Sequence, residues 1–199
     1  MSSVIRRAHK SLVFDRRTRV LASQLAKMLP SGRVLDVGCG DGTIDVLIRE
    51  ARPDVEINGV DVLVRASTAI NVQIFDGMQL PFSDRSFDAV MFIDVLHHTN
   101  DAKVLLNEAR RVTRNMVILK DHTMEGLLAY EVLRLMDWVG NANQGVALPY
   151  NYWSEQQWHQ AFAAVGLKLI SWEARIPLYP FPASLIFGRS LHFLAALIA

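Results

Sequence analysis

The first 121 residues alternate between short continuous apolar runs and segments in which apolar residues recur every three or four positions. The continuous runs predict buried strands, at residues 33–38, 55–61, 71–76, 87–94 and 115–121. The periodic segments predict helices, around residues 14–28, 44–51 and 105–112. Strands that alternate with helices in this way indicate an α/β fold with a parallel sheet that is covered on both faces.

The connection between the second and third predicted strands is shorter than the others. Only nine residues, 62–70, separate Asp61 from Asn71. A complete crossover helix needs about a dozen residues or more. We therefore expect a turn or a short stub of helix at this point.

The pattern changes after the fifth strand. Residues 124–140 predict a helix that is apolar on all faces, which is typical of a buried, oligomeric or lipid-facing helix. SEQQ at 154–157 predicts a capping box that opens another helix. Residues 169–176 alternate as in a half-buried strand, and ASLIFGRS at 183–190 is its predicted hairpin partner. The last run, LHFLAALIA, is then an apolar tail that is too short to span a bilayer.

The composition indicates a globular protein and argues against several other classes of protein. With 199 residues, 51% of them hydrophobic, the chain is long enough for one domain with a sizeable core. The net charge is +1 and the basic residues are interspersed with acids, so no nucleic-acid partner is expected. A single cysteine excludes an intrachain disulfide, and no secretory signal is visible. These features predict a soluble, cytoplasmic protein.

The segment LDVGCGDG, residues 35–42, predicts a glycine loop between the first strand and the helix that follows it. Such a loop presents backbone N–H groups to a ligand. The dinucleotide-binding form has its third glycine three positions after the second, where this chain has Thr43. Asp36 and Asp41 would repel a pyrophosphate and would attract an ammonium and a sulfonium. The charges therefore favour S-adenosylmethionine as the ligand.

Two further acids follow predicted strands. Asp61 ends the second strand, where it can accept hydrogen bonds from two ribose hydroxyls. Asp76 ends the third strand, where it can accept from an adenine amino group, with Gly77 and Met78 beside the ring. The carboxyl ends of parallel strands meet at one edge of a sheet, so the loop and both acids are expected to face one ligand.

These residues resemble those of a class I S-adenosylmethionine-dependent methyltransferase, of the branch that contains the ubiquinone/menaquinone-type enzymes. The resemblance rests on VLDVGCGDG, GVDV, FDGMQLPFSDRSFDAV and DVLHHTND. It implies a Rossmann-like sheet of seven mostly parallel strands with helices on both faces and a C-terminal antiparallel hairpin, at residues 167–190. It also implies S-adenosyl-L-methionine as the cofactor. The predicted cofactor-binding residues are Asp36, Gly38, Cys39, Gly40, Gly42, Asp61, Val62, Asp76, Gly77, Met78 and Asp94.

Residues after the fourth and fifth strands are candidates for acceptor chemistry. His122 can be the catalytic acid–base group, or it can be a hydrogen-bonded loop histidine that caps the next helix. The aromatic residues near position 150 can line an acceptor pocket or form a packed surface loop. The predicted substrate-binding residues are His97, Asp121, Tyr150, Tyr152 and Trp153.

Two single-residue features have alternative interpretations. Cys39 lies at a helix amino terminus, where a thiol can be a nucleophile, but it can also be a small residue that fills a tight loop. His97 and His98 suggest a metal site. However, adjacent residues do not share a helical face, and no further ligand cluster is spaced around them, so no metal is predicted.

The predicted function is transfer of a methyl group from S-adenosylmethionine to a small-molecule or lipid-like acceptor by direct in-line displacement. A single domain, 1–199, is expected, with residues 1–32 as an amino-terminal helix or lid that includes Arg16 and Arg17, and with residues 121–153 as an acceptor-site insertion. The apolar helix and tail suggest peripheral membrane contact. The alternatives are a cofactor-binding regulatory protein without turnover and an NAD-dependent oxidoreductase.

Overall fold

A computed structural model describes residues 15–141 and 148–199 of the chain. Residues 1–14, which include the first part of the predicted lid, lie outside the described residues. So do residues 142–147, which belong to the predicted acceptor-site insertion. The statements below concern the described residues.

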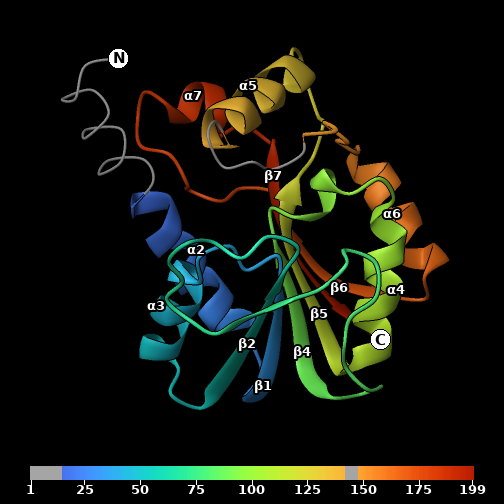
Figure 1. The fold of residues 1–199 in the computed structure, drawn as a ribbon. Helices are drawn as coiled ribbons and strands as arrows, with labels where there is room; N and C mark the ends of the chain where they lie inside the picture. Colours follow the sequence, from blue (N-terminus) through green and yellow to red (C-terminus); the bar gives the residue numbers. More distant parts are fainter. Residues whose placement is uncertain (1–14, 142–147) are drawn as a thin grey trace.

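The centre of the fold is a seven-stranded sheet with the strand order β3-β2-β1-β4-β5-β7-β6 (Figure 1). The first five strands are parallel, and β7 pairs antiparallel with both β5 and β6. The predicted Rossmann-like class, with a mostly parallel sheet and an antiparallel C-terminal pair, is confirmed. The strands are β1 (Gly32–Val37), β2 (Val55–Asp61), β3 (Val72–Ile74), β4 (Phe87–Ile93), β5 (Thr113–His122), β6 (Lys168–Glu173) and β7 (His192–Ile198).

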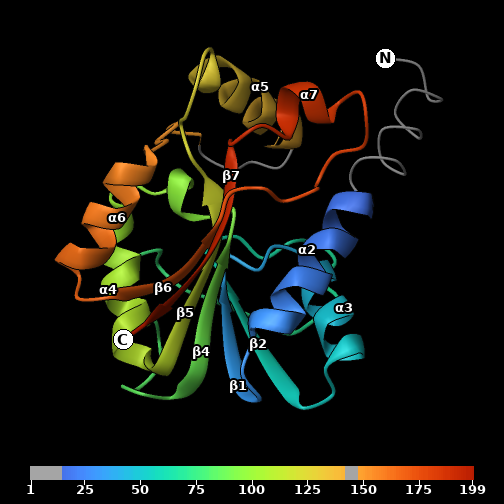
Figure 2. The ribbon, with the colours of Figure 1, turned by 180° about the vertical axis from the view of Figure 1, so that it is seen from behind.

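Helices cover both faces of the sheet (Figures 1 and 2). One face carries α2 (Asp15–Met28) and α3 (Thr43–Ala51), and the other carries α4 (Ala102–Val112) and α6 (Glu155–Ala164). The carboxyl end of the sheet carries α5 (Ala129–Asn141), the short α7 (Ser184–Phe187) and a 3₁₀ turn, η2 (Leu96–His98), which follows β4. This edge is therefore the one at which loops and additional helices accumulate.

Strand β1, which lies inside the sheet between β2 and β4, has one apolar cluster on each of its faces. Leu35 belongs to the apolar cluster that contains Trp158 of α6. Val34 belongs to the cluster that contains Leu21 of α2. Since successive side chains of a strand point to opposite faces, Asp36 points to the same face as Val34. The acid that ends the apolar run therefore lies on the side of the sheet that α2 and α3 cover.

Two local predictions are confirmed. Residues 62–71 contain no helix, so a turn replaces the complete crossover between β2 and β3. The capping box at the start of α6 is also formed. Ser154 Oγ accepts from Gln157 N, and Gln157 Oε1 accepts from Ser154 N.

The C-terminal antiparallel pair exists, but its predicted position was wrong. ASLIFGRS does not form a strand, because α7 occupies residues 184–187 and the partner of β6 is β7. This strand comes from the run that was predicted to be an apolar tail, and six of its seven residues are buried. A strand covered on both faces is apolar at every position, so it lacks the two-residue alternation that identifies a half-exposed strand.

The helix predicted at 124–140 begins later, at Ala129. Gly126 and Leu128 have positive φ angles of 90° and 57°, which a right-handed helix cannot contain. In α5, Leu133 is fully buried whereas Trp138 is exposed, so the helix packs along one side only. Among the described residues, none of the helices combines the length and the hydrophobicity that crossing a bilayer requires.

The position of β7 in the core predicts the effect of truncating its side chains. Leu197 is fully buried, so Leu197→Ala should lower the free energy of unfolding by about 2–5 kcal/mol, because contacts are lost and a cavity remains. Leu127 is 81% exposed, so the matched control Leu127→Ala should change it by less than about 0.5 kcal/mol. Urea unfolding measures both values. Equal effects of the two substitutions would contradict the burial of this strand.

Candidate functional site

The glycine loop connects β1 to α3. Gly38 and Gly40 have φ angles of 79° and 61°, a left-handed backbone that favours glycine. A Cβ on Gly38 would lie 2.5 Å from Val95 Cγ2, so the loop packs closely on the segment after β4. A Cβ on Gly40 would meet no heavy atom of the described residues within 4 Å. The loop therefore has one packed side and one side on which its backbone is open to a ligand.

Asp61, at the end of β2, contacts this loop directly. Its Oδ2 accepts a hydrogen bond from Gly40 N at 2.9 Å, and its Oδ1 accepts one from Leu63 N at 3.0 Å. Two backbone donors thus hold the carboxylate at the carboxyl edge of the sheet, beside the open side of the loop. The predicted ribose-binding acid and the predicted cofactor loop are brought together.

Asp76 lies in a turn after β3. Its Oδ1 accepts from Met78 N and Gln79 N, both at 2.8 Å, and these bonds lower the pKa of the carboxyl. Val62 and Met78 both expose most of their side chains, and a Cβ on Gly77 would lie 3.1 Å from Val62 Cγ1. The residues predicted for ribose and for adenine therefore adjoin along one edge.

Asp36 is buried beneath the loop, beside Asp45 of α3. Burial, together with the neighbouring Asp45 carboxyl, raises the pKa of Asp36 well above its usual value. Burial also raises the pKa of Asp45 to about 7. The pair therefore retains a proton at neutral pH.

Cys39 packs into the protein behind the loop. A Cβ on Gly59 would lie 2.6 Å from Cys39 Sγ, so the thiol fills the space that this glycine of β2 leaves. Burial, and then the nearby carboxyl groups of Asp36 and Asp45, raise the pKa of the Cys39 thiol. A protonated, packed thiol favours the structural interpretation of Cys39 over the nucleophilic one.

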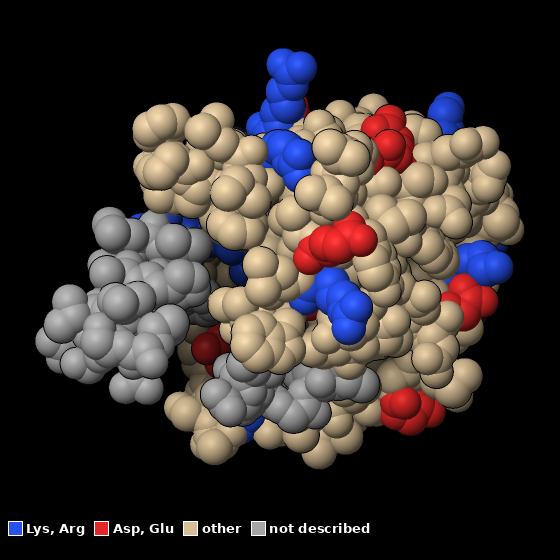
Figure 3. Space-filling view, turned by 90° about the horizontal axis from the view of Figure 1, so that it is seen from above, with Lys and Arg blue, Asp and Glu red and all other residues tan. Residues whose placement is uncertain are grey.

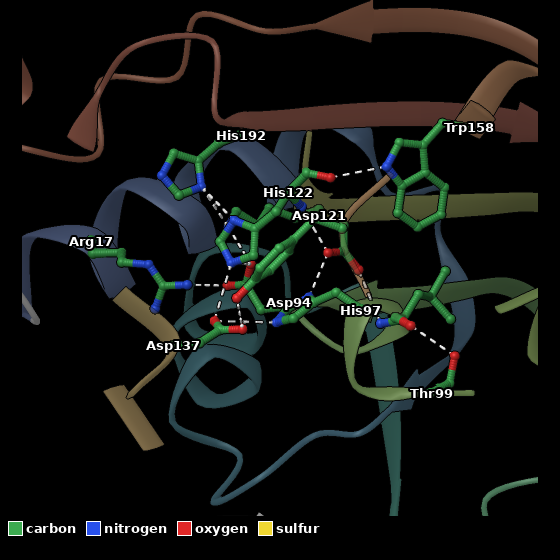
Figure 4. Close-up of polar contacts among 12 residues, drawn as sticks. Arg17, Asp94, His97, Thr99, Asp121, His122, Asp137, Trp158 and His192 are labelled. Atoms are coloured by element: carbon green, nitrogen blue, oxygen red, sulfur yellow. Dashed lines mark hydrogen bonds and ion pairs between the residues drawn. The ribbon is translucent and has the colours of Figure 1, made fainter. Parts of the chain in front are cut away.

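Asp94, directly after β4, binds cations from two other elements (Figure 4). Its Oδ2 pairs with Arg17 of α2, and its Oδ1 pairs with Lys120 of β5. Burial acts to raise the pKa of Asp94, but Lys120 and Arg17 outweigh it and hold this pKa well below its usual value. Lys120 is fully buried, where an ammonium group requires such a partner. This ion cluster joins α2, β4 and β5 at the carboxyl edge.

A chain of histidine hydrogen bonds lies beside this cluster (Figure 4). His192 Nε2 is 3.1 Å from the carbonyl oxygen of Phe187, which can only accept, so His192 carries its proton on Nε2. His192 Nδ1 lies 3.1 Å from His122 Nδ1 and 3.2 Å from Lys120 Nζ, whose ammonium group can only donate to it. Burial and the Lys120 ammonium lower the pKa of both histidines well below the usual value. His122 Nε2 lies 3.6 Å from Asp94 Oδ1 and 3.7 Å from Asp137 Oδ1.

His97, in η2, is held between two carboxylates. Its Nδ1 lies 2.6 Å from Asp121 Oδ1, and its Nε2 lies 3.4 Å from Asp137 Oδ1 of α5. Burial disfavours a charged imidazole, but the two carboxylates raise the pKa of His97 to about 10. Tyr152 Oη donates to Asp137 Oδ2 at 2.5 Å. These contacts attach α5 and the segment around Tyr152 to the end of the sheet.

The predicted substrate-binding residues lie around this edge, and most of them are inside the protein. His97, Asp121 and Tyr152 are buried. Trp153 packs against the apolar core on the α4 and α6 side, and Tyr150 packs against the smaller cluster around Leu133. The aromatic segment is therefore a packed wall of the carboxyl edge.

Some residues of this edge were missing from the sequence interpretation, namely Lys120, Asp137 and His192. Lys120 is a charged residue inside an apolar strand, and this pattern could have identified it as a buried ion. Asp137 and His192 carry no such signal, because one lies in the apolar helix and the other lies in the run that was interpreted as a tail. Arg17, predicted as part of a lid, contacts Asp94.

Comparisons with known proteins agree with this arrangement. A family profile described as "Methyltransferase domain" matches residues 9–171 of the chain. The chain is 31% identical over 121 residues to 27-O-demethylrifamycin SV methyltransferase of Amycolatopsis mediterranei (strain S699), covering 53% of this chain and 44% of that protein. It is 32% identical over 93 residues to ubiquinone/menaquinone biosynthesis C-methyltransferase UbiE of Desulfotalea psychrophila (strain LSv54 / DSM 12343), covering 42% of this chain and 38% of that protein. The matched region thus spans less than half the length of either relative.

A solved structure shows the same fold over most of its length. The S-adenosylmethionine-dependent methyltransferase of Mesorhizobium loti matches with a TM-score of 0.64 and 18% sequence identity, covering 89% of this chain and 96% of that chain. At this identity the similarity concerns the fold alone.

The buried acid pair predicts how stability depends on pH. Folded Asp45 holds its proton up to about pH 7, whereas an unfolded aspartate loses it near pH 4, so the free energy of unfolding should fall as the pH rises between these values. One proton contributes at most about 1.4 kcal/mol per pH unit. Asp45→Asn cannot ionise and should flatten this decline, as measured by urea unfolding at pH 5 and pH 7. Parallel pH profiles for the variant and the parent protein would contradict the retained proton.

Proposed function

Because the chain belongs to the methyltransferase-domain family, we propose that it transfers a methyl group from S-adenosyl-L-methionine to a small-molecule acceptor. Two of its relatives are named for a rifamycin substrate and for ubiquinone/menaquinone biosynthesis, which supports a small-molecule acceptor. The chain covers less than half of those relatives, so their acceptors do not identify the acceptor of this chain.

The observation that carries the proposal is the contact between Asp61 and the glycine loop. Gly40 N donates to Asp61 Oδ2, and the open side of the loop lies beside this carboxylate. A carboxylate in this position can accept hydrogen bonds from two ribose hydroxyls. Asp76 and the exposed Met78 adjoin it, in a position for the adenine ring. These residues fit an adenosyl ligand.

The charges favour S-adenosylmethionine over a dinucleotide. Asp41 is an exposed carboxylate within the loop, and it would repel a pyrophosphate, whereas Asp61 by itself would suit the ribose of either ligand. The ammonium and sulfonium groups of S-adenosylmethionine would be attracted instead. When bound, S-adenosylmethionine supplies an electrophilic methyl group. The chain therefore has to orient the acceptor in line with that group and to exclude water.

Asp94, which the sequence interpretation placed among the cofactor residues, lies where the strand order reverses between β1 and β4, and we assign it to the acceptor side of that position. Arg17 and Lys120 hold the Asp94 carboxylate in place. His122 Nε2 faces this carboxylate. With its proton on Nδ1, the neutral imidazole can take the proton of an acceptor hydroxyl as the methyl group is transferred. An acceptor amine with a free lone pair would not require this base.

The sequence suggested a lipid-like acceptor and membrane contact from two features, an apolar helix and an apolar tail. Only the first of these features remains in the structure. The supposed apolar tail is β7 in the core, so it no longer supports membrane contact. The helices above the carboxyl edge still support membrane contact, because most of the face that they form is uncharged (Figure 3). A lipid-like acceptor therefore stays a prediction. The exposed apolar side chains of α5, α7 and their flanks include Leu127, Leu128, Leu135, Trp138, Val139, Phe181, Leu185 and Ile186.

Neither alternative function has a specific observation in its favour. A regulatory protein without turnover would need only the cofactor residues, whereas this chain also maintains a buried ion cluster at the acceptor side. An NAD-dependent oxidoreductase is disfavoured by Thr43 and by the acids of the glycine loop.

The cofactor assignment predicts the effect of removing the Asp61 carboxylate. The parent protein should bind both S-adenosylmethionine and S-adenosylhomocysteine, and Asp61→Ala should weaken each by about 10- to 100-fold, because charge-assisted hydrogen bonds to the ribose are lost. Isothermal titration calorimetry measures these affinities. The control is Glu56→Ala, an exposed acid near the amino end of the same strand, which should leave both affinities unchanged.

A different binding result would contradict the cofactor assignment. If the folded parent protein bound neither ligand but bound NADH, the methyltransferase proposal would fail and the oxidoreductase alternative would replace it.

The acceptor assignment predicts a change in turnover with little change in cofactor affinity. His122→Asn should lower kcat for a hydroxylated acceptor by about 10²- to 10⁴-fold, because general-base assistance is lost, and should leave the affinity for S-adenosylmethionine unchanged. Transfer of a labelled methyl group to a panel of hydroxylated aromatic compounds measures kcat. His159→Asn, at an exposed histidine of α6, is the control. A His122→Asn variant with the kcat of the parent protein would exclude the role of base.

A further inference from the structure

We propose that His97, His98 and Asp137 form a binding site for one divalent transition-metal cation of the zinc class. One nitrogen of each histidine and one carboxylate oxygen of Asp137 all lie within 4.8 Å of one another. His97 and Asp137 are buried, with 1% and 5% of their surface exposed, and His98 is partly buried. Zinc binds imidazole nitrogen and carboxylate oxygen at about 2.0–2.2 Å, and three protein ligands with one open position are typical of catalytic zinc sites.

The distance between His97 Nε2 and Asp137 Oδ1 fits a shared cation. It is 3.4 Å, whereas a charge-assisted N–H···O bond is about 2.7–2.9 Å long. Two ligands of one tetrahedral zinc ion with the usual bond lengths lie about 3.4 Å apart. The two atoms are therefore spaced as ligands of one ion would be.

Two nitrogen atoms of the cluster make no hydrogen bond of ordinary geometry among the described residues, and one of them has only the 3.4 Å ion-pair contact with Asp137. They are His97 Nε2 and His98 Nδ1, and both atoms are inaccessible to solvent. The two imidazole rings lie against each other, with their centroids 4.0 Å apart. A buried polar atom without a partner is unfavourable, and a cation between the rings and Asp137 would satisfy both nitrogens at once.

The groups behind the candidate ligands are those that orient metal ligands in proteins. Asp121 Oδ1 pairs with His97 Nδ1 at 2.6 Å, which directs the other ring nitrogen, Nε2, toward Asp137. Asp121 is itself fixed by a hydrogen bond from Leu96 N to Oδ2. Tyr152 Oη donates to Asp137 Oδ2, so the other oxygen, Oδ1, faces His97. A carboxylate–histidine pair of this kind fixes ring orientation in metal sites.

The sequence interpretation excluded a metal because His97 and His98 had no third ligand near them. The third ligand comes from α5, which docks over η2 at the carboxyl edge. Since α5 was interpreted as apolar on all faces, its one buried acid was not considered. The two adjacent histidine rings nevertheless converge, with their centroids 4.0 Å apart.

The position of the site suggests what the cation would do. Asp137 Oδ1 lies 3.7 Å from His122 Nε2, the nitrogen that we assign to acceptor chemistry. A cation at this edge could act as a Lewis acid toward an oxygen acceptor. This role rests on the proposed function, whereas cation binding itself does not depend on it.

Calorimetric titration of the untagged, chelator-treated full chain with zinc chloride tests the site. We expect one zinc ion per chain, and Co²⁺ should bind with the visible absorption of a low-symmetry site. His98→Ala removes a ligand from the partly exposed position and should weaken zinc binding by more than about 100-fold, whereas Asp121→Asn, behind the ligand, should weaken it by about 10- to 100-fold. Circular dichroism confirms that each variant is folded.

His159→Ala, on the exposed surface of α6, is the matched control and should bind zinc as the parent protein does. The proposal would be overturned if the parent protein bound no zinc, because a proton alone would then occupy the space between His97 and Asp137. Zinc binding that persists in His98→Ala and disappears in His159→Ala would also overturn it. A chain that binds zinc in this pattern but does not bind S-adenosylmethionine would support the metal site and contradict the proposed function.

Discussion

A buried carboxylate stays ionised only if cations lie next to it, and the carboxyl edge of this protein depends on that requirement at Asp94. Arg17 approaches from α2 and Lys120 from β5, so one carboxylate holds an amino-terminal helix and a central strand against the end of β4. Losing the Asp94 carboxylate would leave the buried Lys120 ammonium without this ion pair, which is strongly unfavourable. The ion cluster therefore limits how the acceptor side of the sheet can rearrange.

The same edge is completed by residues from distant parts of the chain. His192 of β7 and His122 of β5 are joined by a hydrogen bond, and His97 of η2 is joined to Asp137 of α5. Because β7 runs antiparallel to β5, the start of β7 lies beside the end of β5, and His192 is therefore next to His122. The packing of α5 on the carboxyl edge brings Asp137 next to His97. The proposed acceptor side is thus assembled by the C-terminal elements, whereas the proposed cofactor residues belong to the first half of the sheet.

The fold could be predicted where local pattern and burial agree. The five parallel strands and the helices between them follow from apolar runs and helical periodicity, and the short connection after Asp61 followed from counting residues. The prediction failed for β7. Its continuous apolar pattern is that of a strand covered on both faces, and without knowledge of its neighbours the same pattern is equally typical of an apolar tail.

The sequence by itself determined the family, the order of the glycine loop, Asp61 and Asp76, and hence the edge at which a cofactor would lie. This was possible because parallel strands joined by crossovers must all end at one edge, so residues that follow successive strands become neighbours. Only the tertiary structure decided that Asp36 shares a proton with Asp45, that Cys39 is a packed thiol, and that Lys120 pairs with Asp94. It also placed Asp137 beside His97. These contacts depend on which side chains are buried together across long distances in the chain, and the strength of a charge interaction is set by that burial rather than by any local pattern.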